Sequence, residues 1–559
     1  MKRIIYTIIV VLLFSVYSCN KDKILSEVPL DFYSPENSFT KPADVESSIA
    51  YLYARVRALW DGDVNQSDVY YGTDLASGIV GQSYDDYRAQ LVPTAQRPQL
   101  RWTNLYRIVF DANVILNRIG NIEYPDSASK DAHKAEAMFF RAYAYNCLAN
   151  FFGGVPIVLD EITSPRRDFV RNTREAVYQQ CASDLEFAAA NLPDINHVAA
   201  DGRVSKAAAN HLLSEVYIEL KQWDKAIAAA SAVIDNPNFH LMTTRFGSSA
   251  SDTSGDPYYD LFQPNNQNRS SGNTEAIWVL QSEFNIPGGF APLSYSQDGF
   301  KYERFMGPLY WLLKDPNGVA GFIGPTTQNG GRGIGWVRGT YHYTNTIWES
   351  DWNDDIRNAP QNMQRDWIFD NPASKYFGTK VSDAFNKGIQ GYPAVNDTLR
   401  LVYAYPTKVT TRGKHPVEII KNAQTGELQG SAGVTYLDWY LMRLAETYLL
   451  RAEAYLGKGQ KDMAAMDINV VRERAHAKPV TADEVDIDYI LDERMRELNF
   501  EEPRRLTLSR LGMLYDRTVK YGRFSNQSIQ PFNELYPIPY GEIEKNTDAV
   551  LKQNPGYVN

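Results

Sequence analysis

Apolar residues recur at three- and four-residue steps in two long blocks of the chain, about 43–235 and 436–512. This spacing is typical of helices that bury one face. In 209–234 two such runs are separated by Lys221–Gln222, and a second pair of runs surrounds Gly457–Lys458–Gly459. Each break is short, so we expect each pair to form a helix–turn–helix unit.

Alanines are frequent on the facing sides of these predicted helices, which lets paired helices approach closely. Such units resemble tetratricopeptide repeats. They are degenerate and separated by long insertions, so a regular solenoid is not expected. The pattern predicts a mainly α fold with a degenerate tetratricopeptide-like helical-repeat scaffold.

Residues 244–433 have a different character, rich in Gly, Pro, Asn and aromatic side chains. Short strand-like runs occur at Glu275–Gln281 and Leu399–Tyr405. Long irregular connections in a folded domain are usually functional. We therefore predict one mixed globule over 19–559, in which the helical scaffold supports a loop-rich, short-strand binding region.

The N-terminus predicts export. Lys2 and Arg3 precede an apolar run from Ile4 to Val16, and Cys19 follows closely. A membrane-spanning helix needs roughly 20 apolar residues, so this run suits a signal peptide better. A cysteine at the cleavage site allows a lipid to be attached through its thiol. We expect a signal peptide over 1–18, a lipidated Cys19 and an extended tether over 19–40, with an ordinary secretory signal as the alternative because Tyr17 is bulky for a lipoprotein signal.

Composition narrows the class of protein further. After Cys19 no segment approaches the length and apolarity of a membrane span, and 44% apolar residues suffice for a large core. A net charge of −10 argues against nucleic-acid binding, which needs clustered Lys and Arg. Cys147 and Cys181 lie in helical patterns, so we expect two buried free thiols and not a disulfide.

Tryptophan is concentrated in one segment. Five of the ten tryptophans fall in the 57 residues from 311 to 367, with two tyrosines between them. Indole and phenol faces stack on the C–H faces of sugars. Ligand binding and packing are equally open interpretations for four of these residues: Trp336, Tyr341, Tyr343 and Trp348. We expect packing for Trp311 and Trp367, a core strand position for Trp278, and core helical positions for Trp223 and Trp439.

The chain shows no recognisable catalytic constellation, such as His-Glu-x-x-His or a Gly-x-Ser-x-Gly elbow. The best enzymatic candidate is a cluster of carboxylates at Glu349, Asp351, Asp354 and Asp355. A glycosidase needs two carboxylates across a sugar site, but a solvated acidic loop is the preferred interpretation. The alternate spacing of a calcium loop also occurs here, yet Ile356 stands where glycine is expected. No catalytic residue, metal or cofactor is predicted.

Several segments resemble, in order, the SusD/RagB family of outer-membrane lipoproteins from Bacteroidetes nutrient-uptake systems. They are Ala135-Glu-Ala-Met-Phe-Phe-Arg-Ala-Tyr, Phe152-Gly-Gly-Val-Pro, Gly202-Arg-Val-Ser-Lys-Ala, Leu444-Ala-Glu-Thr-Tyr-Leu-Leu-Arg-Ala-Glu-Ala-Tyr, Ile490-Leu-Asp-Glu-Arg-Met-Arg-Glu-Leu, Tyr536-Pro-Ile-Pro and Gln553-Asn-Pro-Gly-Tyr. After Phe500-Glu-Glu the chain departs from the family pattern with Pro503-Arg-Arg-Leu. The resemblance covers nearly the whole mature chain.

The resemblance implies a second candidate patch. In the family, the stretch after an early aspartate, here Asp74, carries an aromatic residue that stacks on glycan. Ser83-Tyr-Asp-Asp-Tyr matches that stretch in position and residue type. Tyr84 and Tyr87 are therefore candidate stacking residues, and Asp86 is a candidate acceptor for sugar hydroxyl groups.

The resemblance also implies the role. It predicts a glycan-binding lipoprotein, anchored in the outer membrane through Cys19, that delivers glycan to a SusC-like TonB-dependent transporter without changing it chemically. Asn20-Lys-Asp-Lys, directly after Cys19, is similar to the signal that sends such lipoproteins to the cell surface. Peptide capture is the nearest alternative, and a secreted glycoside hydrolase is the second.

Overall fold

The computed structural model describes residues 39–60, 67–78, 85–385 and 398–558. The predicted signal peptide, Cys19, nearly all of the tether and Tyr84 lie outside these ranges. None of the helices in the described ranges combines the length and apolarity that a membrane crossing requires.

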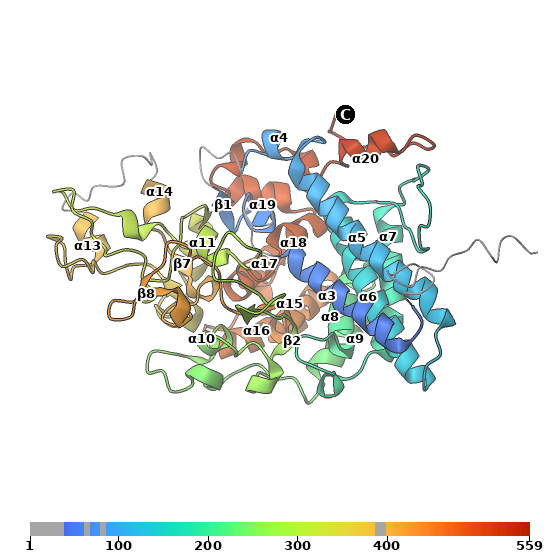
Figure 1. Ribbon diagram of the computed structural model, residues 1–559, viewed down its shortest axis with the longest axis horizontal. Helices are drawn as coiled ribbons and strands as arrows, with labels where there is room; N and C mark the ends of the chain where they lie inside the picture. The colour runs from blue at the N-terminus through green and yellow to red at the C-terminus, as the bar shows by residue number, and fades with distance from the viewer. Residues whose placement is uncertain (1–38, 61–66, 79–84, 386–397, 559) are drawn as a thin grey trace, which may run out of the picture.

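Long helices form one side of the molecule and the loop-rich middle of the chain forms the other (Figure 1). The scaffold helices are α3 (Pro42–Leu59), α5 (Gln96–Arg118), α6 (Ser127–Phe152), α7 (Arg174–Asn191), α8 (Lys206–Glu219), α9 (Trp223–Ile234), α15 (Leu444–Gly457), α16 (Lys461–Arg474) and α17 (Ile487–Leu498). Local sequence sets their ends: the Asp126 carboxylate accepts from the Ser129 amide (2.7 Å) at the start of α6, which stops at Gly153 with φ 73°. The mainly α prediction is confirmed.

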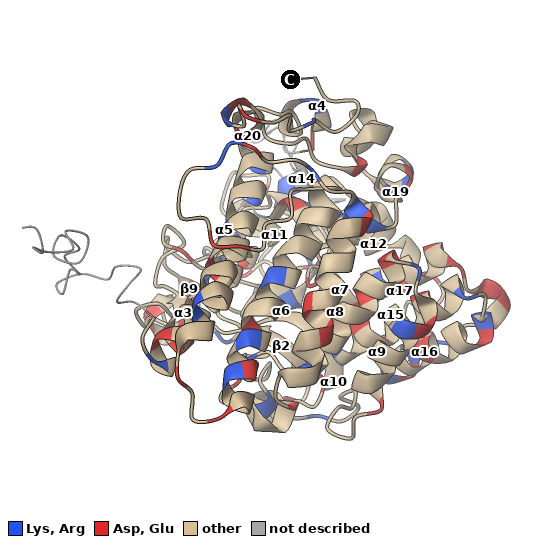
Figure 2. Cartoon of the chain, turned by 90° about the vertical axis from the view of Figure 1, so that its right-hand side faces the viewer, with Lys and Arg blue, Asp and Glu red and all other residues tan. Residues whose placement is uncertain are grey.

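The two predicted helix–turn–helix units are present as α8–α9 and α15–α16. They pack directly on each other through α9 and α15, so that α6 to α9, α15 and α16 form one continuous layer (Figure 2). Gly457 lies at this contact, where an added Cβ would approach the Trp223 ring to 2.7 Å. The half-buried indole of Trp223 thus joins one unit to the next.

The strand predictions need correction. Ala276–Leu280 forms strand β2 as expected, but its antiparallel partner is β10 (Trp439–Arg443), which leads straight into α15. Trp439 is buried as predicted but lies on a strand and not on a helix, because pairing opposite Leu280 overrides the helical spacing. The run ending at Tyr405 is mostly not a strand: Thr398–Leu401 is the short helix α14, and only Tyr405–Pro406 pairs, as β7 with β6 (Met363–Gln364).

The loop-rich side has little regular structure. Its described strands form small two-stranded sheets, and its helices are a few turns at most. In the middle of the chain the further elements are strands β3 (Glu283–Phe284), β4 (Phe290–Ala291), β5 (Val337–Gly339), β8 (Ile420–Asn422) and β9 (Glu427–Leu428), and helices α10 (Pro257–Leu261), α11 (Tyr302–Met306), α12 (Tyr341–Thr344) and α13 (Val381–Phe385). The early part of the chain adds strand β1 (Ala76–Gly78) and helix α4 (Tyr87–Gln90), and the C-terminal part adds helices α18 (Arg504–Arg510), α19 (Leu514–Tyr521) and α20 (Tyr540–Lys545).

A buried network of charges joins the two sides. Glu497 on α17 accepts hydrogen bonds from three buried arginines: Arg357 of the loop-rich side, Arg443 at the end of β10 and Arg474 at the end of α16. These side chains are all 2% exposed or less, except Arg474 at 4%. We call this set the Glu497 network. It holds the middle of the chain against the scaffold.

A second set of buried charges connects the two ends of the described chain. The Asp74 carboxylate accepts from Arg504 (2.7 Å) and Arg517 (2.8 Å), and the Asp68 carboxylate accepts from Arg101 and from the Tyr536 hydroxyl. The C-terminal residues are therefore part of the core that the early helices build. Cys147 and Cys181 are buried free thiols, as predicted.

Candidate functional site

Strand pairing joins the chain segments on either side of which the two predicted patches lie. β1 pairs antiparallel with β5, with Ala76 opposite Gly339, although about half the chain separates them. Directly after β5, the Thr340 amide donates to the Leu75 carbonyl (2.9 Å) and the Thr340 hydroxyl to the Asp74 carbonyl (2.6 Å). The segment that follows Asp74 and the segment that carries Tyr341 therefore share one region of the loop-rich side.

Tyr341 is the exposed aromatic residue of this region. It is the first residue of α12, whose start is capped by the Thr340 hydroxyl accepting from the Tyr343 amide (3.2 Å). The Tyr341 side chain is 71% exposed. A phenol so exposed on a rigidly capped turn can offer a ring face to a sugar, so it remains a candidate.

The structure corrects two of the other three members of the predicted stacking platform. Tyr343 is 0% and Trp348 1% exposed, so neither presents a face to a ligand. The Trp348 indole donates to the Tyr343 carbonyl (2.7 Å), and the Tyr343 ring meets Phe500 edge-on. Trp336 is half-buried and stacks on Phe305, with ring centroids 5.3 Å apart. Packing is therefore the role of Tyr343 and Trp348.

Tyr87 is also a packing residue and not a stacking surface. It is 3% exposed, its hydroxyl donates to the Gly72 carbonyl, and it accepts from Arg505 (2.9 Å). Asp86 caps α4 by accepting from the Arg88 amide (3.0 Å) and is paired with the same residue's guanidinium. Asp86 keeps partial exposure, so its carboxylate can still meet solvent or a ligand.

The predicted carboxylate cluster does not converge on one site. Asp351 is buried against Arg472 (2.8 Å) and Asp355 against Arg357 (2.7 Å), whereas Glu349 and Asp354 are exposed. No described set of three or more His, Cys, Asp and Glu side chains is placed to hold a metal ion. Two of these four carboxylates thus hold the fold together.

The remaining tryptophans are placed by packing. Trp278 and Trp367 are buried, and the Trp367 indole donates to the Asn329 carbonyl (3.2 Å). Trp311 is half-buried, and its indole donates to the Gly333 carbonyl (3.0 Å). Trp352 is 39% exposed, with the Arg365 guanidinium 4.4 Å from its ring centroid.

An open pocket, which the sequence did not predict, lies beside β5. It has a volume of about 360 Å³, and its wall includes Arg338 of β5, Arg365, Asp366, Phe385 and Tyr403. Phe385 is 49% exposed, and half-burial lowers the pKa of Arg365, whose Nη2 donates to Asn358 (2.6 Å). An aromatic face beside guanidinium and carboxylate groups suits a sugar ring and its hydroxyls.

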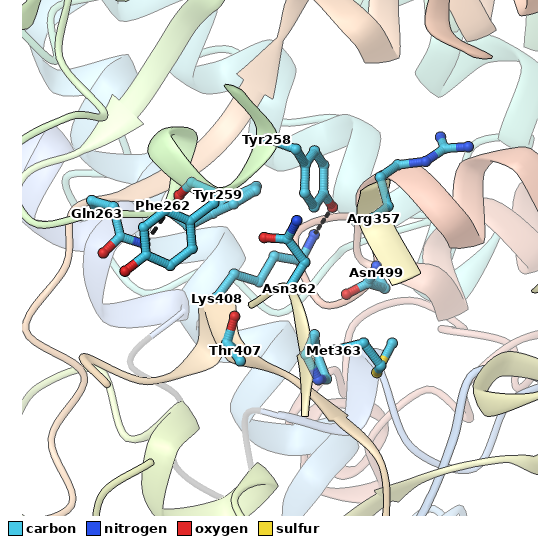
Figure 3. Close-up of a pocket in the computed structure, with 11 residues that line it drawn as sticks. Tyr258, Tyr259, Phe262, Gln263, Arg357, Asn362, Met363, Thr407, Lys408 and Asn499 are labelled. Carbon is cyan, nitrogen blue, oxygen red and sulfur yellow. Dashed lines mark hydrogen bonds between the residues drawn. The ribbon is translucent and has the colours of Figure 1, made fainter. Parts of the chain in front are cut away.

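A second cavity is too small for a ligand of that kind. Figure 3 shows Lys408 and Tyr258 in its wall, with the Lys408 amine donating to the Tyr258 hydroxyl (3.1 Å). Its volume is about 10 Å³, room for one water molecule. Burial lowers the pKa of Lys408 to about 8, although the amine also donates to Glu501 (2.6 Å). Lys408 is thus an internal ion-pair partner that no sugar ring can reach here.

Comparison with known proteins decides the family. The SusD family model matches residues 240–557, and a model described as starch-binding associating with outer membrane matches 30–218. The chain belongs to the SusD family. The resemblance seen in the sequence is therefore confirmed.

Individual SusD relatives match over different lengths. A SusD-like protein of Formosa agariphila is 23% identical over 566 residues, covering 96% of each chain. The starch-binding protein SusD of Bacteroides thetaiotaomicron is 38% identical over 125 residues, 21% of each chain. A solved laminarin-binding SusD-like protein superposes with a TM-score of 0.67 at 21% identity, covering 93% of this chain and 100% of that one. This last likeness shows the SusD-like fold.

Proposed function

We propose that this SusD-family protein is a cell-surface lipoprotein that captures an oligo- or polysaccharide and passes it, chemically unchanged, to a SusC-like TonB-dependent transporter. The observation that carries the proposal is exposed Tyr341, which follows Arg338 of the open pocket by three residues, directly after the strand β5 that pairs with β1. Relatives described as laminarin-binding and starch-binding support a glycan as the ligand. The outer-membrane description of the matching family supports the location.

Binding without chemistry is supported by the arrangement of carboxylates. A glycosidase places two carboxyl groups about 5–10 Å apart on either side of the scissile bond. Of the four clustered candidates, Asp351 and Asp355 are neutralised by buried arginines. Recognition of sugar faces and hydroxyl groups needs no such pair.

The first prediction tests the ligand surface. Tyr341→Ala should weaken glycan binding by about 2 kcal/mol, roughly 30-fold, because an aromatic face at a binding site carries much of the affinity. The free energy of unfolding should change by less than about 0.5 kcal/mol, since the ring is exposed. Calorimetry against a polysaccharide panel, with urea unfolding alongside, measures both.

Tyr51→Ala is the matched control, because Tyr51 is 51% exposed on α3 of the scaffold. It should leave binding unchanged. Equal loss in both variants would show that the effect is not local to the Tyr341 surface. Capture of peptides with no affinity for any glycan would contradict the proposed ligand class.

The second prediction tests the anchor. Cys19→Ala should move the protein from the membrane fraction to the soluble fraction and abolish incorporation of labelled palmitate, because the lipid supplies the proposed membrane attachment. Ser18→Ala is the control, since it keeps the thiol beside a small residue. Sedimentation of the Cys19→Ala protein with salt-washed membranes would refute the lipoprotein interpretation.

A further inference from the structure

Two arginines on the loop-rich side share one aromatic ring. The Arg304 guanidinium of α11 lies 3.6 Å from the centroid of the Tyr295 ring, and that of Arg332 lies 5.4 Å from it. Arg332 is also 5.6 Å from the Trp311 ring. All four side chains are half-buried, so the cluster borders solvent. We call these residues the Tyr295 cluster.

The positive charge of this cluster is not balanced locally. In the described parts of the chain no carboxylate lies within 4.0 Å of either guanidinium, and the Nη1 atom of each is buried without a hydrogen-bond partner. Two fully buried arginines, Arg443 and Arg504, are by contrast paired with carboxylates. The Tyr295 side chain attracts the two cations but carries no carboxylate charge that could neutralise them.

Neighbouring groups do not remove this imbalance. Burial lowers the pKa of both arginines, and the charge of Arg332 lowers that of Arg304 further. Glu303 raises the pKa of Arg332, but its carboxylate is already bonded to His415 (2.7 Å), Thr410 (3.1 Å) and the Arg332 amide (2.9 Å). Two positive charges are therefore held close together, and each guanidinium keeps an Nη1 donor without a hydrogen-bond acceptor.

The backbone around the cluster is closely packed and hydrogen-bonded. Gly333 lies against Gly307 so closely that an added Cβ would come within 2.2 Å of the Gly307 carbonyl, and Trp311 is fixed by its bond to the Gly333 carbonyl. The Ile334 amide donates to the Arg304 carbonyl (2.8 Å). These contacts join the two segments that carry the arginines. Ligand binding therefore needs little further ordering of the backbone, and the backbone entropy lost on binding is small.

We propose that Arg304 and Arg332 bind an anionic substituent of the glycan, a carboxylate or a sulfate ester, while Tyr295 and Trp311 contact the sugar ring that carries it. The inference rests on the proposed function and narrows its ligand to acidic glycans. Guanidinium forks match the oxygens of both anions, and their charge-assisted bonds gain strength where water is partly excluded.

The test compares acidic oligosaccharides with neutral counterparts. Calorimetry uses oligogalacturonate against its carboxyl-reduced form, and sulfated galactan oligosaccharides against their desulfated form, so that the two anions are distinguished. Wild-type protein should bind one acidic probe and lose that affinity as salt rises. Arg304→Gln and Arg332→Gln should each weaken it by about tenfold or more. The double variant should bind the acidic probe no better than the neutral one.

Arg166→Gln/Arg167→Gln is the matched control, because it removes the same charge from an exposed part of the scaffold side. Arg304→Lys keeps the charge but loses the fork, so it should bind at an intermediate level, and it replaces the glutamine variant if that fails to fold. Equal wild-type affinity for acidic and neutral probes would overturn the inference while leaving glycan capture intact. So would a folded double variant with wild-type affinity for the acidic probe.

A sulfate titration separates the inference from the proposed function. Sodium sulfate should raise the melting temperature of the wild type more than that of the double glutamine variant, compared with chloride at equal ionic strength. If no glycan binds but this difference is present, the anion site stands and glycan capture fails. If no glycan binds and the difference is absent, both are wrong.

Discussion

Replacement of Glu497 with glutamine is expected to lower the free energy of unfolding by about 3–5 kcal/mol, because it removes the one carboxylate that three buried arginines share and leaves an excess of buried positive charge. The Glu497 carboxylate accepts from Arg357 (2.9 Å) and Arg443 (2.5 Å) and also from Arg474. Each guanidinium is almost completely buried. Water cannot replace the lost charge without opening the contact between the scaffold and the loop-rich side.

Urea unfolding at pH 7 measures this effect, with Glu473→Gln as the control. Glu473 lies between Arg472 and Arg474 on α16 but is exposed, so its loss should change stability by less than about 0.5 kcal/mol. Similar midpoints for the two variants would mean that the Glu497 network contributes nothing beyond an exposed charge.

Two carboxylates of α17, Glu497 and Glu493, which accepts from Arg357 of the Glu497 network (2.7 Å), should make stability fall in acid. Burial raises the pKa of Glu493, but the charges of Arg357, Arg496 and Arg472 outweigh it and lower the pKa from 4.5 to about 2. The pKa of Glu497 is likewise well below its ordinary value. A carboxylate with a depressed folded-state pKa contributes fully above its unfolded value of about 4.5, and that contribution is lost as pH falls toward 2. The Glu497→Gln protein should therefore show a shallower loss between these pH values.

Trp348→Ala is expected to lower the free energy of unfolding by roughly 3–5 kcal/mol, the usual cost of removing a buried aromatic side chain. Trp348 is 1% exposed, and its indole hydrogen bond to the Tyr343 carbonyl (2.7 Å) is lost with it. Chemical unfolding gives the cost directly. Any loss of glycan binding should follow the fraction unfolded and disappear at temperatures where the variant is fully folded.

Trp352→Ala is the matched control from the same segment. Its side chain is 39% exposed and contacts Arg365 through its ring, so truncation should cost no more than about 1 kcal/mol. A Trp348→Ala protein as stable as the Trp352→Ala protein, with glycan binding lost, would restore Trp348 to the ligand surface.

The elements that the sequence predicted correctly are those defined by local spacing. The helix pairs α8–α9 and α15–α16 each bury a face whose period can be read within the run itself. Trp439 was misplaced because its strand exists only through pairing with β2, far away in the chain. Spacing alone does not contain that information.

The candidate site was less predictable for a related reason. Irregular segments have no period, so aromatic residues in them are buried or exposed by whatever distant element covers them. Arg496 of α17 donates to the Ile347 carbonyl (2.7 Å) and fixes the segment of Trp348 against the core. Tyr341, only a few residues earlier, has no such cover. The Tyr295 cluster was likewise invisible, because its four members come together only in the folded chain.

The hydrogen bonds that Asp68 and Asp74 accept link the folding of the early helices to the C-terminal part of the chain. Their partners Arg504, Arg517 and Tyr536 follow 430, 443 and 468 residues later in the chain. While a ribosome or an export channel still holds the C-terminal part, the early helices can gather but cannot bury these two carboxylates with all their partners. The N-terminal half therefore reaches its complete set of buried ion pairs only after the last part of the chain has emerged.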